Sequence, residues 1–572
     1  MRKLSELHKK LNNIEWFEPV FTISMSLIVT FVIIVAVKSM FSEQDISIAS
    51  NKAEEYFYEG KYDDAISEYT ELQKSDEWPI WRVKLAEVYA IKGDYEKSDM
   101  LLREAIIIRN RLIEKNKEKY LEKDKEFMNE VVFNFFMNNE IEQALSLGED
   151  YILNNDKYKP LMRTMFAVYM AAGETENAND IVNEYEVDKD SAYDMALLAS
   201  MQMMTEDIED GLYTLKMAYE LDKNEIKVFD VIRDLTYYNN EELLTKLIEL
   251  SETTNDEAYN MFLAKAYLID SEDYSSSENI LKLLGESSKE SINYKLMESE
   301  ILRSKGKVEE ANSIIDSIIN SKERSYSIDY ISAMELYNEG KYDKALEYCK
   351  KSILENDDYP DNYENLIPNI LLEKNDVSSI DSYFRTALLR EPFNLKMIVK
   401  IGDYYAYKLE DYDIASDYYN LALRVNQNDA ELYYAVGNME ISKGEYEKAA
   451  EYLEKAISLD DNNNKYYRAL GIIYLKLGEN EKAIESTRYA YYLNEEDVLA
   501  LSNAGCYYLS VEGDIWRGFS NIEAAYEEMS DNLDEESKNM IIENYTKAKK
   551  LFDSYIEEEE TEFIVPDFHL FY

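Results

Sequence analysis

Apolar residues recur along most of this chain at the spacing of three and four positions that is typical of amphipathic helices. A six-residue motif separates consecutive helices. It comprises a glycine, a polar residue, a variable position that is most often tyrosine, two further polar residues and a small residue. The glycine suits a left-handed helix cap, the polar residues begin the next helix, and the small residue suits a close approach of two helices. Copies of the motif lie at 60–65, 93–98, 173–178, 306–311, 340–345, 444–449 and 478–483. The pattern predicts an all-α fold.

The small residues of this motif recur with a period of 34. The step from Ala415 to Ala449 equals this period, and so does the step from Ala449 to Ala483. Two further ladders keep the same period, and they comprise Ala422, Ala456, Ala490 and Ala524, and Gly437, Gly471 and Gly505. The step from Ser98 to Ala144 is longer than the period, and we expect an extended helix over 109–125 to absorb the difference. Ladders in phase indicate an array of repeats.

This pattern resembles the tetratricopeptide repeat, a pair of antiparallel helices in about 34 residues. Gly437, Ala449 and Ala456 match the family's small positions, and Tyr446 and Tyr474 match aromatic ones. The resemblance is strong over 48–110 and 326–525 and degenerate over 125–325. It implies an α-solenoid of about fourteen helical hairpins between residues 47 and 530, closed by a capping helix at 534–556.

An uncharged segment precedes the repeats. Residues 20–37 carry no charge over 18 positions, which as a helix would span roughly 27–30 Å, close to the thickness of a bilayer core. A cleaved signal peptide is the alternative, but its apolar core is normally shorter. Four basic residues precede the segment and two follow it closely, which favours a cytoplasmic N-terminus. The sequence therefore predicts a single-pass protein of the cell membrane that contacts the lipid bilayer through 20–41 and carries an extracytoplasmic repeat domain.

These observations divide the chain into predicted segments. They are a cytoplasmic N-terminal segment (1–19), a transmembrane anchor (20–41), N-terminal repeats (47–110), degenerate repeats (111–325), C-terminal repeats (326–530), a capping helix with an acidic run (531–560) and an apolar tail (561–572). The tail carries large apolar residues after four consecutive glutamates. Three alternatives stay open for it: a fold back onto the last repeats, a docking peptide for a partner, or a disordered end.

Charge and composition exclude several functions. The chain has 62 Lys and Arg against 116 Asp and Glu, a net charge of −54, whereas a nucleic-acid-binding surface needs clustered basic residues. Only two histidines and two cysteines are present, and no phosphate-binding or dinucleotide-binding glycine loop occurs. We therefore predict no nucleic-acid partner, no catalytic residue, no cofactor and no metal site, and the chain is not predicted to be an enzyme.

The resemblance also implies a binding surface. In this family the first helix of each repeat lines a concave groove, and its groove positions carry over to Lys396, Lys400, Tyr407, Tyr434, Asn438, Lys465, Arg468 and Lys476. Cations here could hold an acidic peptide or a terminal carboxylate through charge-assisted hydrogen bonds. Of the family's carboxylate clamp only Asn438 and Lys465 match, while Tyr434 and Ala469 depart from it. The alternative is that the lysines balance neighbouring glutamates and the tyrosines pack within the repeats.

The sequence thus predicts a membrane-anchored bacterial scaffold that binds partner proteins at the cell envelope through its groove. Two other functions stay open. The chain could be a component of an exopolysaccharide synthesis or export machine, with groove tyrosines touching polysaccharide. It could also be a cytoplasm-facing adaptor or co-chaperone, which requires the opposite orientation.

Overall fold

The computed structural model describes residues 46–155, 157–205, 208–238, 240–270, 273–530, 533–556 and 564–572. Within these ranges every regular element is a helix. The first part of the chain forms α3 (Lys52–Tyr58), α4 (Tyr62–Ser75), α5 (Ile80–Ile91), α6 (Tyr95–Met137), α7 (Ile141–Asn154), α8 (Lys159–Ala172), α9 (Thr175–Glu184), α10 (Ala192–Met204), α11 (Ile208–Leu221), α12 (Lys227–Tyr238), α13 (Asn240–Thr254), α14 (Glu257–Asp270), α15 (Tyr274–Lys282), α16 (Glu286–Lys289), α17 (Ile292–Ser304) and α18 (Val308–Ile319).

The second part continues the same pattern of paired helices. It forms α19 (Tyr326–Asn338), α20 (Tyr342–Glu355), η1 (Asn362–Leu366), α21 (Ile367–Glu373), α22 (Ile380–Arg390), α23 (Leu395–Tyr404), η2 (Tyr405–Leu409), α24 (Tyr412–Val425), α25 (Ala430–Lys443), α26 (Tyr446–Leu459), α27 (Asn464–Lys476), α28 (Asn480–Leu493), α29 (Val498–Tyr507), η3 (Tyr508–Glu512), α30 (Ile515–Glu527) and α31 (Glu535–Ile556). The η elements are single π-helical turns. We count the two halves of α6 separately, join each π-helical turn to the α-helix beside it and leave out the one-turn α16. The described helices between Lys52 and Glu527 then pair into fourteen hairpins, and α31 packs on the last of them.

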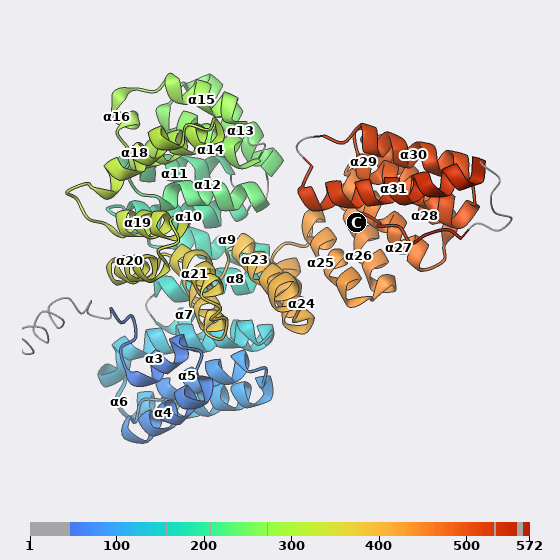
Figure 1. The fold of residues 1–572 in the computed structure, drawn as a ribbon. Helices are drawn as coiled ribbons and strands as arrows, with labels where there is room; N and C mark the ends of the chain where they lie inside the picture. The colour runs from blue at the N-terminus through green and yellow to red at the C-terminus, as the bar shows by residue number, and fades with distance from the viewer. Residues whose placement is uncertain are drawn as a thin grey trace, which may run out of the picture.

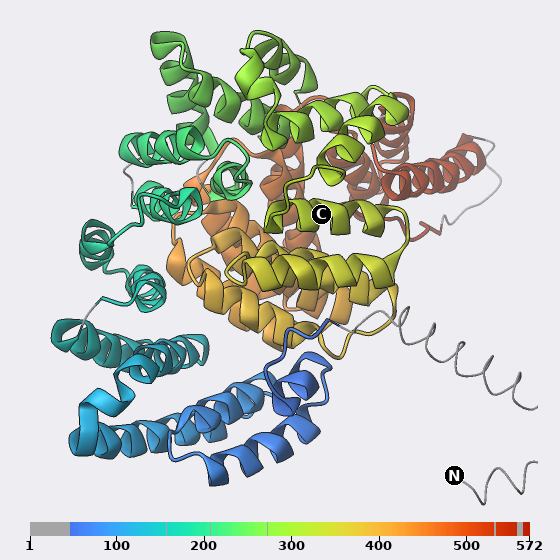
Figure 2. The same ribbon diagram turned by 90° about the vertical axis from the view of Figure 1, so that its left-hand side faces the viewer.

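The hairpins are arranged in two parts, a body formed by α3–α24 and an arm formed by α25–α31 (Figure 1). In the body the chain rises from α3–α7 at the bottom to α11–α18 at the top, and α19–α24 then run back between them (Figure 2). The returning segment touches the earlier helices, since α3 contacts α22, α8 contacts α24 and α12 contacts α23. The body is therefore a solenoid whose later repeats pack against its earlier ones.

The turn motif explains the hairpins. At the end of α25, Gly444 adopts a left-handed conformation with φ +79°, and its N–H donates to the carbonyl of Ile441 at 2.9 Å. A side chain at this φ would be strained, which is why the motif begins with glycine. Farther along the motif, Ala449 is fully buried between the two helices of the hairpin. The small residue of the motif thus marks the close contact that the sequence predicts.

The long step in the period coincides with a kink. Helix α6 runs for 43 residues, but Asn116 has non-helical backbone angles (φ −161°, ψ 85°). Its first half completes one hairpin and its second half begins the next. Across the kink, the Arg109 guanidinium donates to both carboxylate oxygens of Asp124, at 2.6 and 2.5 Å, and Asp124 is 1% exposed. The extended helix predicted over 109–125 is thus two helices joined by a kink and held by this ion pair.

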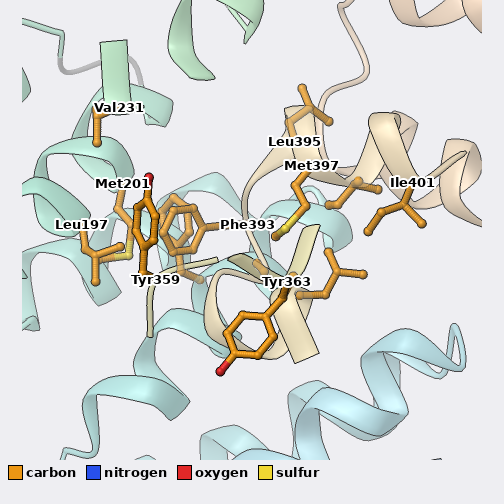
Figure 3. Close-up of a cluster of buried hydrophobic side chains, with 14 of the residues drawn as sticks. Leu197, Met201, Val231, Tyr359, Tyr363, Phe393, Leu395, Met397 and Ile401 are labelled. Carbon is orange, nitrogen blue, oxygen red and sulfur yellow. The ribbon is translucent and has the colours of Figure 1, made fainter. Parts of the chain in front are cut away.

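Side chains of α10 and α12 meet side chains of the returning segment in the interior of the body. Figure 3 shows Leu197 and Met201 of α10 and Val231 of α12 beside Tyr359 and Phe393 of the returning segment. Buried ion pairs accompany this apolar contact. Lys227 lies 2.5 Å from Glu391, with both side chains 2% exposed, and Arg233 donates to both oxygens of Asp361 at 2.7 and 3.0 Å. The returning segment therefore fills the inner side of the solenoid at α10–α12.

The membrane prediction needs correction. The predicted anchor (20–41) and the segment before it (1–19) lie outside the described residues. Across the described part of the chain, no helix combines the length and the apolar character that crossing a bilayer requires. The helices there bury an apolar stripe against their neighbours and expose charged residues elsewhere, and even α6 carries many charges. We therefore correct the prediction: a single-pass membrane protein with a lipid-facing anchor and an extracytoplasmic repeat domain is not supported.

Candidate functional site

Two of the groove residues predicted from sequence, Lys396 and Lys400, pair with acidic or amide groups of the body. On α23, the Lys396 amine lies 3.5 Å from the carboxylate of Asp234 on α12. Burial and the neighbouring Arg233 guanidinium lower the pKa of Lys396. The amine of Lys400 donates to Glu364 at 2.8 Å and to the side-chain oxygen of Asn365 at 3.0 Å. Because both lysines pair with the chain's own groups, we do not include them in the candidate site.

The other predicted residues follow one another from η2 along α25 and α27. Tyr407 is half exposed, and burial of its other half raises its pKa to about 12. The ring of Tyr434 packs against that of Tyr466, with ring centroids 5.2 Å apart. The side-chain oxygen of Asn438 is buried and has no hydrogen-bond partner among the residues that the structure describes. Lys465 and Lys476 are exposed on α27.

Arg468 leads to a site that the sequence prediction did not reach. Its guanidinium is 8% exposed and forms an ion pair with Asp497 at 2.6 Å. The same guanidinium donates from Nε and Nη2 to the carbonyl oxygen of Tyr572, at 3.2 and 3.1 Å. Residues 564–572, which we call the tail segment, therefore fold back onto the arm, against α27, α29 and α31 (Figure 1).

Two asparagines hold the main chain of the tail segment. Phe571 donates its N–H to Oδ1 of Asn503 at 2.9 Å and accepts from Nδ2 of the same residue at 2.7 Å. His569 makes the same pair of bonds with Asn544, both at 2.8 Å. In an extended chain the N–H and C=O of alternate residues point to the same edge, so residues two apart meet the two asparagines. We call Asn503 on α29 and Asn544 on α31 the asparagine pair.

Apolar contacts on both sides complete the site. Phe571 is 5% exposed and packs in a cluster with Val498, Leu501, Ala525 and Ile541. Phe568 and Leu570 pack in a second cluster, which comprises Cys506, Leu509, Phe519, Ile522, Ala548 and Leu551. Burial raises the pKa of the Cys506 thiol to about 12, so this cysteine acts as an apolar wall and not as a nucleophile. The site thus holds the chain's own tail segment through main-chain hydrogen bonds and through large apolar side chains.

The 34-residue period could have identified Asn503, one of the two asparagines. Asn503 lies one period after Ala469 and two periods after Ala435, so it occupies the same groove position one repeat later. Continuing the register by one repeat would have identified it. Asn544 lies on the capping helix, outside the period, and no repeat position identifies it. The groove residues Tyr434, Asn438, Lys465 and Lys476 do not appear among the hydrogen-bonding partners of the described tail segment.

Comparisons with known proteins agree with the repeat assignment. One family model, TPR repeat, matches residues 437–478, and another, Tetratricopeptide repeat, matches residues 51–106. No curated protein matches the chain.

The fold is similar to several solved structures. The Cut9 and Hcn1 hetero-tetramer of the APC/C has 17% identity, covers 87% of this chain and 95% of that chain, and has a TM-score of 0.37. Yeast Tom70 has 14% identity, covers 89% and 97%, and has a TM-score of 0.35. YrrB, titled a TPR protein with an unusual peptide-binding site, has 22% identity, covers 36% and 100%, and has a TM-score of 0.27. Within this array of helical hairpins, residues 51–106 and 437–478 match models of the tetratricopeptide repeat.

Proposed function

We propose that this protein is a scaffold that binds an extended segment of a partner protein in the groove of the arm, between α27, α29 and α31. One observation carries the proposal: the chain's own tail segment lies in this groove, with two of its residues held by main-chain hydrogen bonds to Asn503 and Asn544. Every extended polypeptide presents the same N–H and C=O groups at every second residue. The asparagine pair is therefore suited to a segment of a different protein.

Arg468 places a positive charge at one end of the groove. It lies beyond the asparagine pair and donates two hydrogen bonds to the last carbonyl of the tail segment. Lys465 and Lys476 are exposed on the same helix. A partner segment with a carbonyl or carboxylate at this end gains charge-assisted hydrogen bonds, which favours an acidic or carboxylate-bearing peptide.

The test is direct binding in trans. The chain with residues 564–572 deleted is titrated with a labelled synthetic peptide of the sequence of residues 564–572, and binding is followed by fluorescence anisotropy. We expect saturable one-to-one binding. In that deleted chain, Asn503→Ala or Asn544→Ala removes two hydrogen bonds, so binding should weaken by about 5- to 100-fold.

The matched control is Asn177→Ala in the same deleted chain. Asn177 is an exposed asparagine on α9 whose side-chain amide donates to Glu174 at 2.6 Å, and this change should leave peptide binding unaltered. A deleted chain that unfolds cooperatively and yet shows no saturable binding would overturn the proposed function.

A further inference from the structure

The tail segment does more than show that the groove accepts a peptide. We infer that it is a built-in competitor for the groove, and that the partner segment carries large apolar side chains at the positions that Phe568, Leu570 and Phe571 occupy. The inference rests on the proposed function of the groove. It adds the kind of partner and the condition under which that partner binds.

The side-chain pattern follows from the extended conformation. Neighbouring side chains of an extended chain point to opposite sides, and residues two apart share a side. Phe568 and Leu570 share the cluster around Leu509 and Phe519, while Phe571 enters the other cluster, with Val498 and Ile541. The groove therefore selects for an aromatic residue, any residue, an aliphatic residue and an aromatic residue in succession.

The position between Phe568 and Leu570 tolerates a polar residue. The alternation places His569 on the side of Phe571. Its imidazole lies 3.0 Å from the carboxylate of Glu543, and 37% of its side chain is exposed. Farther from the clusters, Ile564 is 88% exposed. Specificity thus resides in the three buried or half-buried apolar side chains, and the rest of the segment contributes mainly its backbone.

The second part of the inference is self-occupancy, by which we mean that the tail segment fills the groove of its own chain until a partner displaces it. In the unbound chain both asparagines are buried, Asn503 at 3% and Asn544 at 0% exposure, and the tail segment supplies their partners. The tail segment is joined to α31 through only a short stretch of chain, 557–563. A short tether gives an effective concentration on the order of millimolar, so a partner segment must outcompete the tail and its apparent affinity falls accordingly.

The test compares four proteins with the same labelled peptide of residues 564–572. They are the intact chain, the chain lacking 564–572, the Phe571→Asp chain and the Ile564→Asp chain. The Phe571 change places a charge in an apolar cluster and should release the tail. The Ile564 change is the matched control, because it adds the same charge at a tail position that contacts neither cluster.

We expect the intact and Ile564→Asp chains to bind the peptide about tenfold or more weakly than the other two chains. A peptide with aspartate in place of its Leu570 and Phe571 equivalents should not bind any of them. Hydrogen exchange of the intact chain gives a second reading: the amides of His569 and Phe571 should be protected, and an excess of unlabelled peptide should remove the protection.

Each alternative result has a distinct meaning. Equal binding by the intact and deleted chains would overturn the competitor role and leave the proposed function standing. Equal binding of the aspartate peptide would overturn the apolar selection. Concentration-dependent dimers of the intact chain that vanish on tail deletion would show exchange between copies and overturn self-occupancy. If none of the four proteins binds the peptide, the proposed function itself fails.

Discussion

Asn503 and Phe571 form a two-way pair: the N–H of Phe571 donates to the side-chain oxygen of Asn503 at 2.9 Å, and the side-chain amide of Asn503 donates to the carbonyl of Phe571 at 2.7 Å. An amide side chain here does what a neighbouring strand does in a β-sheet, since it supplies one acceptor and one donor to the same residue. This pairing fixes which way the amide faces. An acceptor must stand opposite the N–H and a donor opposite the carbonyl.

The orientation of that amide can be tested with Asn503→Asp. Aspartate keeps the shape and the acceptor but replaces the donor with a second oxygen that faces the carbonyl of Phe571. We expect the tail segment to lose about 1–3 kcal/mol of binding free energy and to be cleaved faster by added protease. Asn177→Asp, an exposed asparagine on α9, is the control and should leave cleavage of the tail unchanged. Unaltered tail protection in Asn503→Asp would mean that the apolar contacts alone hold the segment.

The small-residue ladder predicts a destabilising effect at Gly471. An added Cβ would lie 2.5 Å from the hydroxyl of Thr487 and 3.1 Å from the carbonyl of Ala483. Gly471→Ala should therefore lower the free energy of unfolding by about 1–3 kcal/mol, although alanine is the better helix former. Combining it with Thr487→Ala removes the nearest clash and should recover part of the loss. Urea unfolding followed by circular dichroism measures both, and a stabilised Gly471→Ala chain would contradict the close contact.

The helical hairpins and their period could be predicted from the sequence because the contacts that define them lie within one repeat. The alanine and glycine ladders report contacts within one hairpin, such as that of Ala449, and these recur once in every period. The packing of α19–α24 against the earlier helices could not be predicted. It depends on contacts such as that of Lys227 with Glu391, which lie far apart in the sequence and are not related by the period. The sequence prediction also missed Asn544, since the groove of the arm is completed by the capping helix. The site arises where the regular repeat ends.

The ion pair of Lys227 and Glu391 predicts a large loss on single substitution. Both side chains are 2% exposed, and the pair joins α12 to the chain after α22. Lys227→Met leaves a buried carboxylate without its partner, which costs about 3–5 kcal/mol, whereas Lys227→Met with Glu391→Leu should restore most of the stability. The matched control is Lys52→Met, since Lys52 pairs with Glu68 at the surface, where water screens the pair, and its loss should leave the unfolding temperature nearly unchanged. Thermal unfolding monitored by circular dichroism measures all three, and a double variant less stable than Lys227→Met would refute this account.

The buried carboxyl of Asp230 predicts a pH dependence of stability. Burial raises its pKa from 3.8 to about 7, and its carboxylate lies 3.0 Å from Arg233 and accepts from the hydroxyl of Tyr359 at 2.8 Å. Because the folded chain holds this proton more tightly than the unfolded chain, the group's contribution to stability is present below pH 4 and is lost as pH rises to about 7. Asp230→Asn removes that loss, so the free energy of unfolding of the variant relative to the natural chain should rise by about 1–3 kcal/mol between pH 5 and pH 8.

Asp343, whose pKa is lowered and not raised, provides the control for this prediction. The amine of Lys374 lowers the pKa of the exposed Asp343, so Asp343→Asn should show no such gain between pH 5 and pH 8. Urea unfolding at pH 5, 6, 7 and 8 measures the three chains under matched conditions. A relative stability of Asp230→Asn that stays flat over this range would mean that Arg233 keeps Asp230 ionised in the folded chain. The Arg233 guanidinium lowers the pKa of Asp234 and of Asp361, so both carboxyls are ionised in the folded chain from pH 5 to pH 8 and the change over this range reports Asp230.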